Sequence, residues 1–398
     1  MNARKFACLT GAAGLALAAA GAARAEDTPP AAAAAPATAP AGPTALSSPA
    51  MSASLSSNAD PLNMDWGPLG KIYVSGQLSA FGAAQTAAGS DSQKRKGDIS
   101  NAQLEIQKTD GVFQFYVQAG IYDLPSLGAP IATSDRLTES TYRYVPVAYI
   151  KIAPNSAFNV EVGELPTLIG AEYTFSYQNL NIERGLLWNQ EPAISRGVQA
   201  NYTQGPLALS VSINDGYFSE HYSTLSGLAT YTLSPKDTLA VAASGNFDKT
   251  SRSTFVTPIA QNNGTIWNIL YTHTEGNWMI NPYLQYSTTP KDVAFGLPSS
   301  ASTFGAAVLA KYQFNTLFNL AGRVEYTSSS GSDVSLLYGT KSDAWSFTLT
   351  PTLQFKTYFV RGEFSYTKID SGTPGLEFGK FANKDEQSRA MIETGVLF

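Results

Sequence analysis

The chain has 398 residues, of which 14% are charged and 11% aromatic, and its mean hydropathy is −0.10. Soluble domains carry about 25% charged residues, so this charge content is low. Two histidines and one cysteine exclude a disulfide framework and a structural metal cluster. The net charge of −5 provides no basic field for nucleic acid, and we expect no cofactor and no metal.

The first 25 residues have the layout of a secretory signal peptide. Arg4 and Lys5 give a basic start, an Ala- and Leu-rich stretch follows, and residues 23–25 form an A-x-A cleavage site. The apolar stretch is too short and too rich in Ala and Gly to span a bilayer. The sequence therefore predicts export with cleavage after Ala25, which also removes Cys8.

Residues 26–65 consist mainly of Ala, Pro, Ser and Thr. A segment of this composition buries too little apolar surface to offset the entropy of ordering. We expect a disordered periplasmic leader over 26–65 and a single barrel domain over 66–398.

Apolar and polar residues alternate from Lys71 onward, as in residues 113–121. Successive side chains of a strand point to opposite faces, so each such strand has one apolar and one polar face. Seven tight turns interleave with eight longer connections. This all-β pattern predicts a transmembrane antiparallel β-barrel of about 16 strands, within about 14 to 18, with short periplasmic turns and long extracellular loops.

A soluble β-sandwich is the structural alternative for an alternating chain. A sandwich does not normally sort its connections into one end of tight turns and one end of long loops, as outer-membrane barrels do. Pro146, Pro282 and Pro351 interrupt predicted strands, because proline cannot donate to the ladder, and they set the width of the strand range.

Aromatic residues recur near both ends of the predicted strands, which indicates two girdles at the membrane interfaces. The pairs are Trp278 with Tyr286, Phe304 with Tyr312, Trp345 with Phe355, and Tyr358 with Tyr366.

The polar strand faces hold as many acidic as basic residues, and we assign them to the pore wall. A Lys or Arg facing lipid at mid-membrane would cost about 2–4 kcal/mol. A barrel of about 16 strands is too wide for side chains to fill, so an aqueous channel is expected. The wall candidates are Glu105, Lys151, Glu161, Lys311, Arg323, Glu325, Arg361, Glu363, Arg389 and Glu393.

The longest connection, 165–195, is the third long loop. By resemblance to general porins, whose third long loop folds into the barrel, it is our candidate constriction. Carboxylates opposite guanidinium groups filter solutes by charge. The excess of acids predicts a mild cation preference, lowered by replacing Glu172 and Glu183 with Gln, unless these are solvated charges of an outward loop. The constriction candidates are Glu164, Glu172, Glu183, Arg184, Glu191 and Arg196.

Three segments of the chain resemble the OmpL-like β-barrel porins. They are 162–172, with the pattern Gly-x-x-Pro/Thr-x-x-Gly-x-Glu, 179–181 with Pro192 and Gly197, and the strand end 214–217, where Asp215 lies within an Asn-Gly-aromatic motif. The resemblance covers roughly Trp66 to Phe398. It implies a bacterial outer-membrane channel for small hydrophilic solutes rather than an enzyme, and by analogy with such porins a homotrimer.

Two shorter signals concern assembly and lipid. The final strand ends in Phe398 and resembles the C-terminal signature of outer-membrane proteins, in which the last aromatic residue is recognised by the barrel-assembly machinery. Phe398 is thus the predicted assembly signal. The basic run 94–96 either pairs with lipopolysaccharide phosphates or is a solvated loop tip.

Two other functions stay open. An outer-membrane hydrolase would need a histidine base beside a nucleophile, and His221, near Ser219 and Ser223, is the candidate on the loop side. His273 is expected to be an interfacial residue. A structural or adhesive barrel would not conduct ions, so conductance in a planar bilayer separates it from a porin.

Overall fold

The computed structural model describes residues 54–58, 60–89, 93–331 and 337–398. The predicted signal peptide and most of the predicted leader lie outside these residues. The strands are β1 (Leu62–Asp65), β2 (Lys71–Gln85), β3 (Arg95–Lys108), β4 (Phe113–Tyr122), β5 (Val147–Ile152), β6 (Phe158–Pro166), β7 (Ile194–Gln204), β8 (Leu207–Asn214), β9 (Thr224–Ser234), β10 (Asp237–Asn246), β11 (Thr265–Glu275), β12 (Trp278–Thr289), β13 (Ala301–Gln313), β14 (Phe318–Gly331), β15 (Asp343–Phe355), β16 (Tyr358–Asp370) and β17 (Glu386–Leu397). The helices are α2 (Ser134–Ser140) and α3 (Ile259–Asn262), with 3-10 turns η1 (Gly67–Leu69), η2 (Ser176–Gln178), η3 (Trp188–Gln190) and η4 (Val293–Phe295). Across the described ranges, no helix is long and apolar enough to cross a bilayer.

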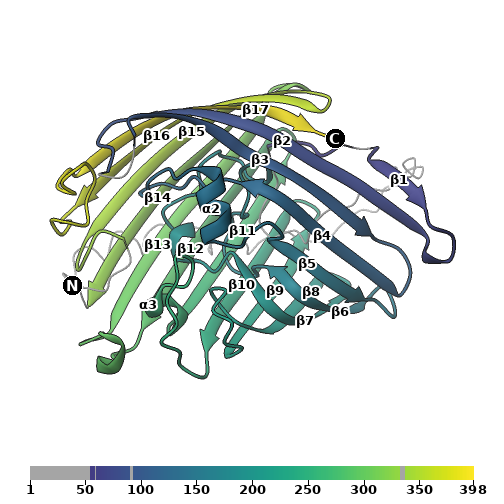
Figure 1. The fold of residues 1–398 in the computed structure, drawn as a ribbon, viewed down its shortest axis with the longest axis horizontal. Helices are drawn as coiled ribbons and strands as arrows, with labels where there is room; N and C mark the ends of the chain where they lie inside the picture. The colour runs from purple at the N-terminus through teal and green to yellow at the C-terminus, as the bar shows by residue number, and fades with distance from the viewer. Residues whose placement is uncertain (1–53, 59, 90–92, 332–336) are drawn as a thin grey trace, which may run out of the picture. The chain divides into compact units, whose positions relative to one another are not determined.

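Strands β2 to β17 form a closed antiparallel barrel of 16 strands, which confirms the predicted fold (Figure 1). Each strand pairs with its neighbours in the chain, and β17 pairs with β2 from Arg389↔Gln85 to Leu397↔Gln77. The short β1 pairs with the first residues of β2 and continues the edge where β17 ends. Closure pairs every barrel strand on both sides, which a sheet in hydrocarbon requires.

The connections alternate in length along the described chain. Tight turns such as 356–357 join one end of the strand pairs, and long loops such as 123–146 and 167–193 join the other. Strands β2 and β3 reach further into the first loop than expected, so that loop spans 86–94 instead of 83–99. We name the two ends of the barrel the short-turn end and the long-loop end.

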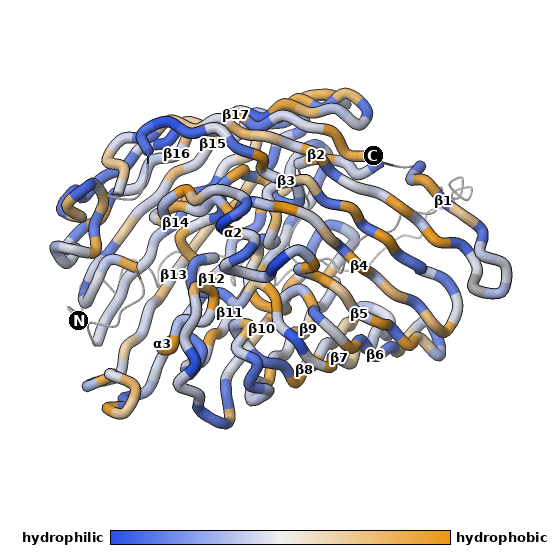
Figure 2. Tube along the Cα trace, viewed as in Figure 1, coloured by the Kyte–Doolittle hydropathy of each residue, from blue (hydrophilic) through white to orange (hydrophobic). Residues whose placement is uncertain are grey.

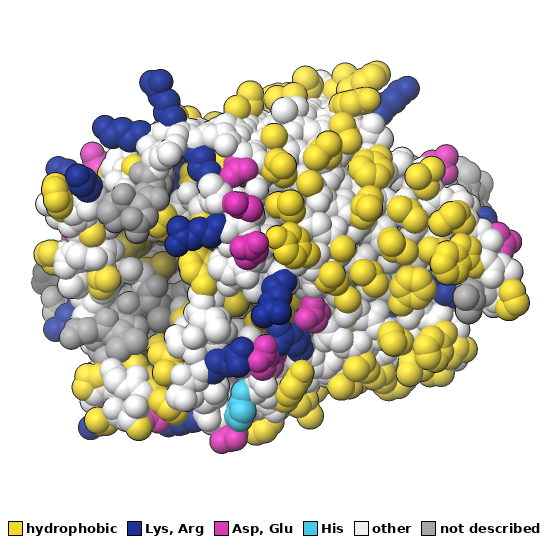
Figure 3. Space-filling model, in the orientation of Figure 1, with side chains coloured by type: hydrophobic (Ala, Val, Ile, Leu, Met, Phe, Trp, Pro, Cys, Tyr) yellow, Lys and Arg dark blue, Asp and Glu magenta, His cyan; other side chains and the backbone are white. Residues whose placement is uncertain are grey.

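Side chains alternate between an exposed apolar face and a buried polar face. In β15, Phe347 and Leu349 are exposed, whereas Thr348 and Thr350 are buried. Figure 2 shows the same alternation as hydrophobic and hydrophilic segments succeeding one another along the strands. Figure 3 shows apolar side chains over the visible outer face of the barrel, bordered by a line of acidic and basic side chains.

Aromatic side chains contact one another near both ends of the outer face. The rings of Trp278 and Tyr312 lie 4.6 Å apart at the short-turn end, and those of Tyr326 and Trp345 lie 4.5 Å apart at the long-loop end. Because amphipathic rings favour the membrane interface, these two groups fit the predicted girdles.

The prolines interrupt fewer strands than expected. Pro146 precedes β5, while Pro282 and Pro351 lie inside β12 and β15. The register between β11 and β12 skips residues 281 and 282, and the Asn281 side chain donates to the Tyr271 carbonyl oxygen at 2.9 Å. The amide thus replaces the N–H that proline lacks.

Candidate functional site

The connection between β6 and β7, residues 167–193, folds against the inner wall of the barrel, and we call it the inward loop. Its Leu180 and Leu187 are fully buried in one apolar cluster with Leu309 and Ala321 of β13 and β14. Gln285 of β12 donates to the Leu187 carbonyl oxygen at 2.9 Å. Apolar burial and hydrogen bonds to the wall therefore position this loop together.

Arg323 of β14 binds the inward loop through a carboxylate and a carbonyl. Its Nη1 donates to Glu172 Oε1 at 2.5 Å and to the Glu183 carbonyl oxygen at 2.8 Å. Its Nε donates to Glu325 on the same strand at 3.1 Å. These ionic groups are withdrawn from water, so loss of one partner would leave a buried charge, at a cost of about 3–5 kcal/mol.

Arg361 of β16 binds the part of the inward loop between Glu172 and Glu183. It donates to the carbonyl oxygens of Ser176 at 3.0 Å and Asn179 at 3.1 Å, while its Nε donates to Glu393 of β17 at 3.1 Å. Glu393 in turn accepts from the Ser176 hydroxyl at 2.8 Å. The strand pair and the loop thus share one hydrogen-bonded network.

Glu183 of the inward loop binds the wall through both its side chain and its backbone. Its carboxylate accepts from Arg389 Nη1 at 2.7 Å and from the Ser365 hydroxyl at 2.8 Å. Its backbone N–H donates to Glu363 Oε1 at 2.9 Å, and Ile182 N–H donates to the other oxygen. Wall residues predicted to face open water therefore hold the loop.

Two charged groups of the inward loop have no hydrogen-bond partner among the described residues. The Arg184 guanidinium is fully buried and lies 5.1 Å from the Trp188 ring centroid. Both carboxylate oxygens of Glu191 are buried without a partner, as is the Tyr283 hydroxyl. Neither Arg184 nor Glu191 forms a hydrogen bond or a salt bridge through its side chain with another described residue.

Burial shifts the pKa of both unpartnered groups. It lowers the pKa of Arg184 to about 10, against the attraction of nearby acids including Glu172, so the guanidinium stays cationic at neutral pH. Burial also raises the pKa of Glu191 well above 4.5, and the negative charges of Glu172 and Glu325 raise it further. Glu191 therefore keeps its proton to higher pH than an exposed glutamate.

The remaining wall candidates also face inward. Lys151 lies 3.6 Å from Glu161 on the neighbouring strand. Glu105 accepts from the hydroxyl of Tyr177, a residue of the inward loop, at 2.9 Å. Lys311 follows the fully buried Leu309 on the inner face of β13, two residues further along the strand.

Glu164 and Arg196 lie elsewhere than expected. They are paired across β6 and β7, and share the outward face with the exposed Val162 and Val198. Their side chains are 3.2 Å apart, and Arg196 Nη1 lies 3.2 Å from Glu220. Both belong to the outer rim at the long-loop end and not to the inward loop, because an even spacing from Val162 and Val198 fixes their face.

His221 lies between a serine and an aspartate. Its Nδ1 is 2.9 Å from Ser223 Oγ and its Nε2 is 3.4 Å from Asp248. Ser223 is buried and Asp248 is 70% exposed, whereas a hydrolase needs an accessible nucleophile and a buried carboxylate. His273 bonds to Asp237 at 2.7 Å on the outer face near a tight turn.

Sequence reasoning missed the contribution of a second loop, 123–146. Ser126 forms a parallel bridge with Arg184, and Arg389 donates to the Ser126 carbonyl oxygen at 2.9 Å. Asp123 is buried beside this contact, and burial raises its pKa to about 7. No motif in this loop signals the contact, since it uses backbone groups that every residue has.

The basic run and the last residue have defined places. Lys94 is exposed, whereas Lys96 bonds to the Ile131 carbonyl oxygen at 3.3 Å and lies 3.7 Å from Asp98. Phe398 exchanges backbone hydrogen bonds of 2.8 and 2.9 Å with Gly76 of β2. Phe398 thus completes the seam where β17 meets β2.

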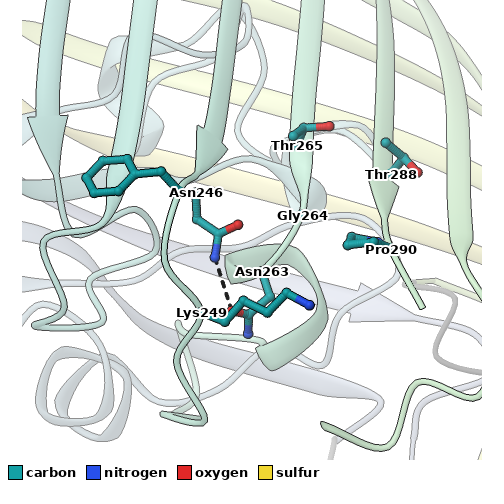
Figure 4. A pocket seen from close by; sticks show the side chains of 8 residues that line it. Asn246, Lys249, Asn263, Gly264, Thr265, Thr288 and Pro290 are labelled. Atoms are coloured by element: carbon teal, nitrogen blue, oxygen red, sulfur yellow. Dashed lines mark hydrogen bonds between the residues drawn. The ribbon is translucent and has the colours of Figure 1, made fainter. Parts of the chain in front are cut away.

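A pocket of about 370 Å³ lies at the long-loop end beside β10, β11 and β12 (Figure 4). Asn246 donates to Asn263 at 3.1 Å across it, and Lys249 lies at its edge. In the part of the chain that the structure describes, no group of three or more His, Cys, Asp or Glu side chains could hold a metal ion.

Comparison with known proteins agrees with this geometry. The family described as "Putative beta-barrel porin-2, OmpL-like" matches residues 71–398, and no curated protein matches the chain. OmpT, an outer-membrane protein of Vibrio cholerae, has a TM-score of 0.58 at 12% identity, covering 85% of this chain and 100% of that one. An anion-selective porin from Comamonas acidovorans has a TM-score of 0.58 at 10% identity, covering 82% and 99%. The outer-membrane channel DcaP of Acinetobacter baumannii has a TM-score of 0.53 at 10% identity, covering 82% and 97%.

Such identities show a shared fold. The fold and the family together imply a porin-like barrel of the bacterial outer membrane. The chain belongs to the OmpL-like family of β-barrel porins.

Proposed function

We propose that the barrel is a passive diffusion channel for small hydrophilic solutes or ions, with its constriction where the inward loop crosses the interior. The observation that carries this proposal is the fixation of the loop by buried arginines of β14, β16 and β17, which bind two loop carboxylates and two loop carbonyl oxygens. A loop that merely covered an inert barrel would not need such costly buried charges. A rigid loop gives a constriction of constant size.

In our proposal the charge filter of this channel is Arg184, which is cationic at neutral pH, and Glu191 adds a negative charge only at a pH high enough to remove its proton. Both side chains are buried in the inward loop without a hydrogen-bond partner in the described residues, so the field of each, when it is charged, acts on a passing solute. Glu172 and Glu183, which the sequence singled out, are bound to Arg323 and Arg389 and serve as loop anchors instead.

Single-channel recording of the purified protein in a planar bilayer tests the function. Discrete open steps support a channel, and their decline with solutes of graded size measures the constriction. A silent barrel would favour a structural or adhesive role. Ester or peptide turnover that is lost in His221→Ala, with no conductance, would favour the hydrolase.

The partners of the channel follow from its surfaces in our proposal. The apolar belt and aromatic girdles face outer-membrane lipid, with lipopolysaccharide phosphates beside Lys94, and the barrel-assembly machinery recognises Phe398. A solved form of Vibrio cholerae OmpT is a trimer, and we extend this state to the present chain as a homotrimer. Cross-linking in outer-membrane extracts would test it.

A further inference from the structure

A short segment ahead of β1 enters the barrel at the short-turn end. Ser54 and Leu55 are both 6% exposed. The Ser54 hydroxyl donates to the Leu180 carbonyl oxygen of the inward loop at 3.0 Å. This segment was expected to be part of a disordered leader, yet it contacts the element that crosses the interior.

Side-chain amides of two neighbouring strands bind the backbone of this segment. Gln354 of β15 accepts from the Ser56 N–H at 2.8 Å and donates to the Ser56 carbonyl oxygen at 2.7 Å. Asn319 of β14 donates to the Ser54 carbonyl oxygen at 3.1 Å. A primary amide that pairs with both backbone groups of one residue imitates a strand partner, so it recognises an extended peptide regardless of side chain.

An apolar pocket receives the side chain between these two backbone contacts. Leu55 packs with Phe359 of β16 and Leu397 of β17, and Tyr177 of the inward loop packs against the same cluster. Phe359 and Leu397 face inward, where most neighbouring wall positions are polar. Binding of an apolar side chain at this place explains why these two inner positions are apolar.

We propose that the inner wall at the short-turn end is a binding site for an extended peptide with a central apolar residue, occupied by the chain's own residues 54–56. This strap braces the inward loop from below through Leu180 and Tyr177. The strap narrows the proposed channel at its periplasmic, short-turn end. The effect on conductance rests on the proposed channel function, whereas the binding of the strap does not.

Thiol labelling tests the binding step without reference to conduction. The sequence has one cysteine, Cys8, in the predicted signal peptide, so Leu55→Cys introduces a single reactive thiol into the exported chain. We expect slow modification of this thiol by a water-soluble maleimide in the folded barrel. Adding Gln354→Ala should speed it at least about tenfold, because two hydrogen bonds are lost.

Two variants serve as matched controls. Ser57→Cys places a thiol on the exposed Ser57 and should react fast in both backgrounds. Gln313→Ala removes an amide that bonds only within its own turn, to Asn315 and Phe318, and should leave Cys labelling at position 55 slow. Equal rates at positions 55 and 57 in the unaltered wall would overturn the strap.

Conductance tests the bracing step. Leu55→Asp puts an ionised carboxylate against Phe359 and Leu397, so the strap should detach and the open-channel conductance should rise above that of the unaltered chain. Slow labelling of the thiol in Leu55→Cys, together with unchanged conductance in Leu55→Asp, would overturn the bracing. If every variant is silent, the channel function fails, and the labelling rates still decide the binding.

Discussion

At the scale of single residues, inward-facing charges differ in whether a partner neutralises them. Glu172 and Glu183 are bound to arginines of the wall, whereas Glu191 and Arg184 have no hydrogen-bond partner in the described chain. Only an unneutralised charge can discriminate between ions at useful range. Residue type alone does not separate these two groups.

Glu191→Gln should lower the cation-to-anion permeability ratio of the channel at a pH high enough to ionise Glu191 in the unaltered protein. The pKa of Glu191 is raised, so the carboxylate forms as pH rises, and cation preference should increase with pH in the unaltered protein. Glu191→Gln should flatten this dependence, as measured by reversal potentials in a salt gradient. Asp123, whose pKa is about 7, also contributes to the pH dependence of the selectivity. A double variant that combines Glu191→Gln with Asp123→Asn removes both contributions. A steep pH dependence that persists in the double variant would refute this assignment.

Arg323→Ala should loosen the inward loop. It leaves Glu172 and Glu325 buried without their cation, which costs about 3–5 kcal/mol. We expect a lower melting temperature and noisier open steps than in the unaltered protein. The exposed Lys380→Ala is the matched loss of charge and should change neither. Identical melting of the two variants would count against the anchor.

At the scale of elements, the inward loop depends on one close backbone approach. Gly170 has φ +88°, and a Cβ there would lie 1.8 Å from Glu191 Oε2. The loop can therefore place Glu191 beside this turn only with glycine at 170. Strands β6 and β7 flank the loop but do not determine its direction, since either direction leaves their pairing intact.

Gly170→Ala should displace Glu191 and change ion selectivity. Gly205 in a tight turn also has positive φ, +57°, but has no atom within 4 Å of an added Cβ. Gly205→Ala should therefore lower the free energy of unfolding by about 1–2 kcal/mol through backbone strain, without a steric clash, and should leave ion selectivity unchanged. Reversal potentials and thermal melting of both variants check this, and equal selectivity in the two would disprove the steric argument.

At the scale of the whole molecule, the seam between β17 and β2 closes the barrel. A Cβ on Gly76 would lie 2.6 Å from the Phe398 ring and 2.7 Å from the Gln103 carbonyl oxygen. Phe398 can therefore cover this position only because residue 76 is glycine. The short β1 pairs only with residues 71–74 of β2, so the rest of this edge, residues 77–85, depends on β17 for its backbone hydrogen bonds.

Gly76→Ala and deletion of Phe398 should both reduce the fraction of closed barrel. Gly362→Ala is the matched change, because an added Cβ there meets only the Pro351 side chain at 3.6 Å. The shift in gel mobility between unheated and heated samples measures closed barrel in isolated outer membranes. Full closure of the Gly76→Ala barrel would contradict the seam argument.

The sequence by itself determined the strands, their faces and the sorting of loops, because a period of two and the turn residues are local properties. The outward placement of Glu164 was also within its reach, since Glu161 faces inward and lies an odd number of residues away. Its assignment to the constriction followed from its place beside the loop, not from its face.

Only the tertiary structure decided which charges are neutralised and where the loop and the strap lie. Arg361 binds carbonyl oxygens of Ser176 and Asn179, and Gln354 binds the backbone of Ser56. Backbone groups are the same in every residue, so the sequence holds no pattern for such contacts. They form because closure of the barrel brings residues nearly 300 positions apart within hydrogen-bond distance, as in Ser56 and Gln354.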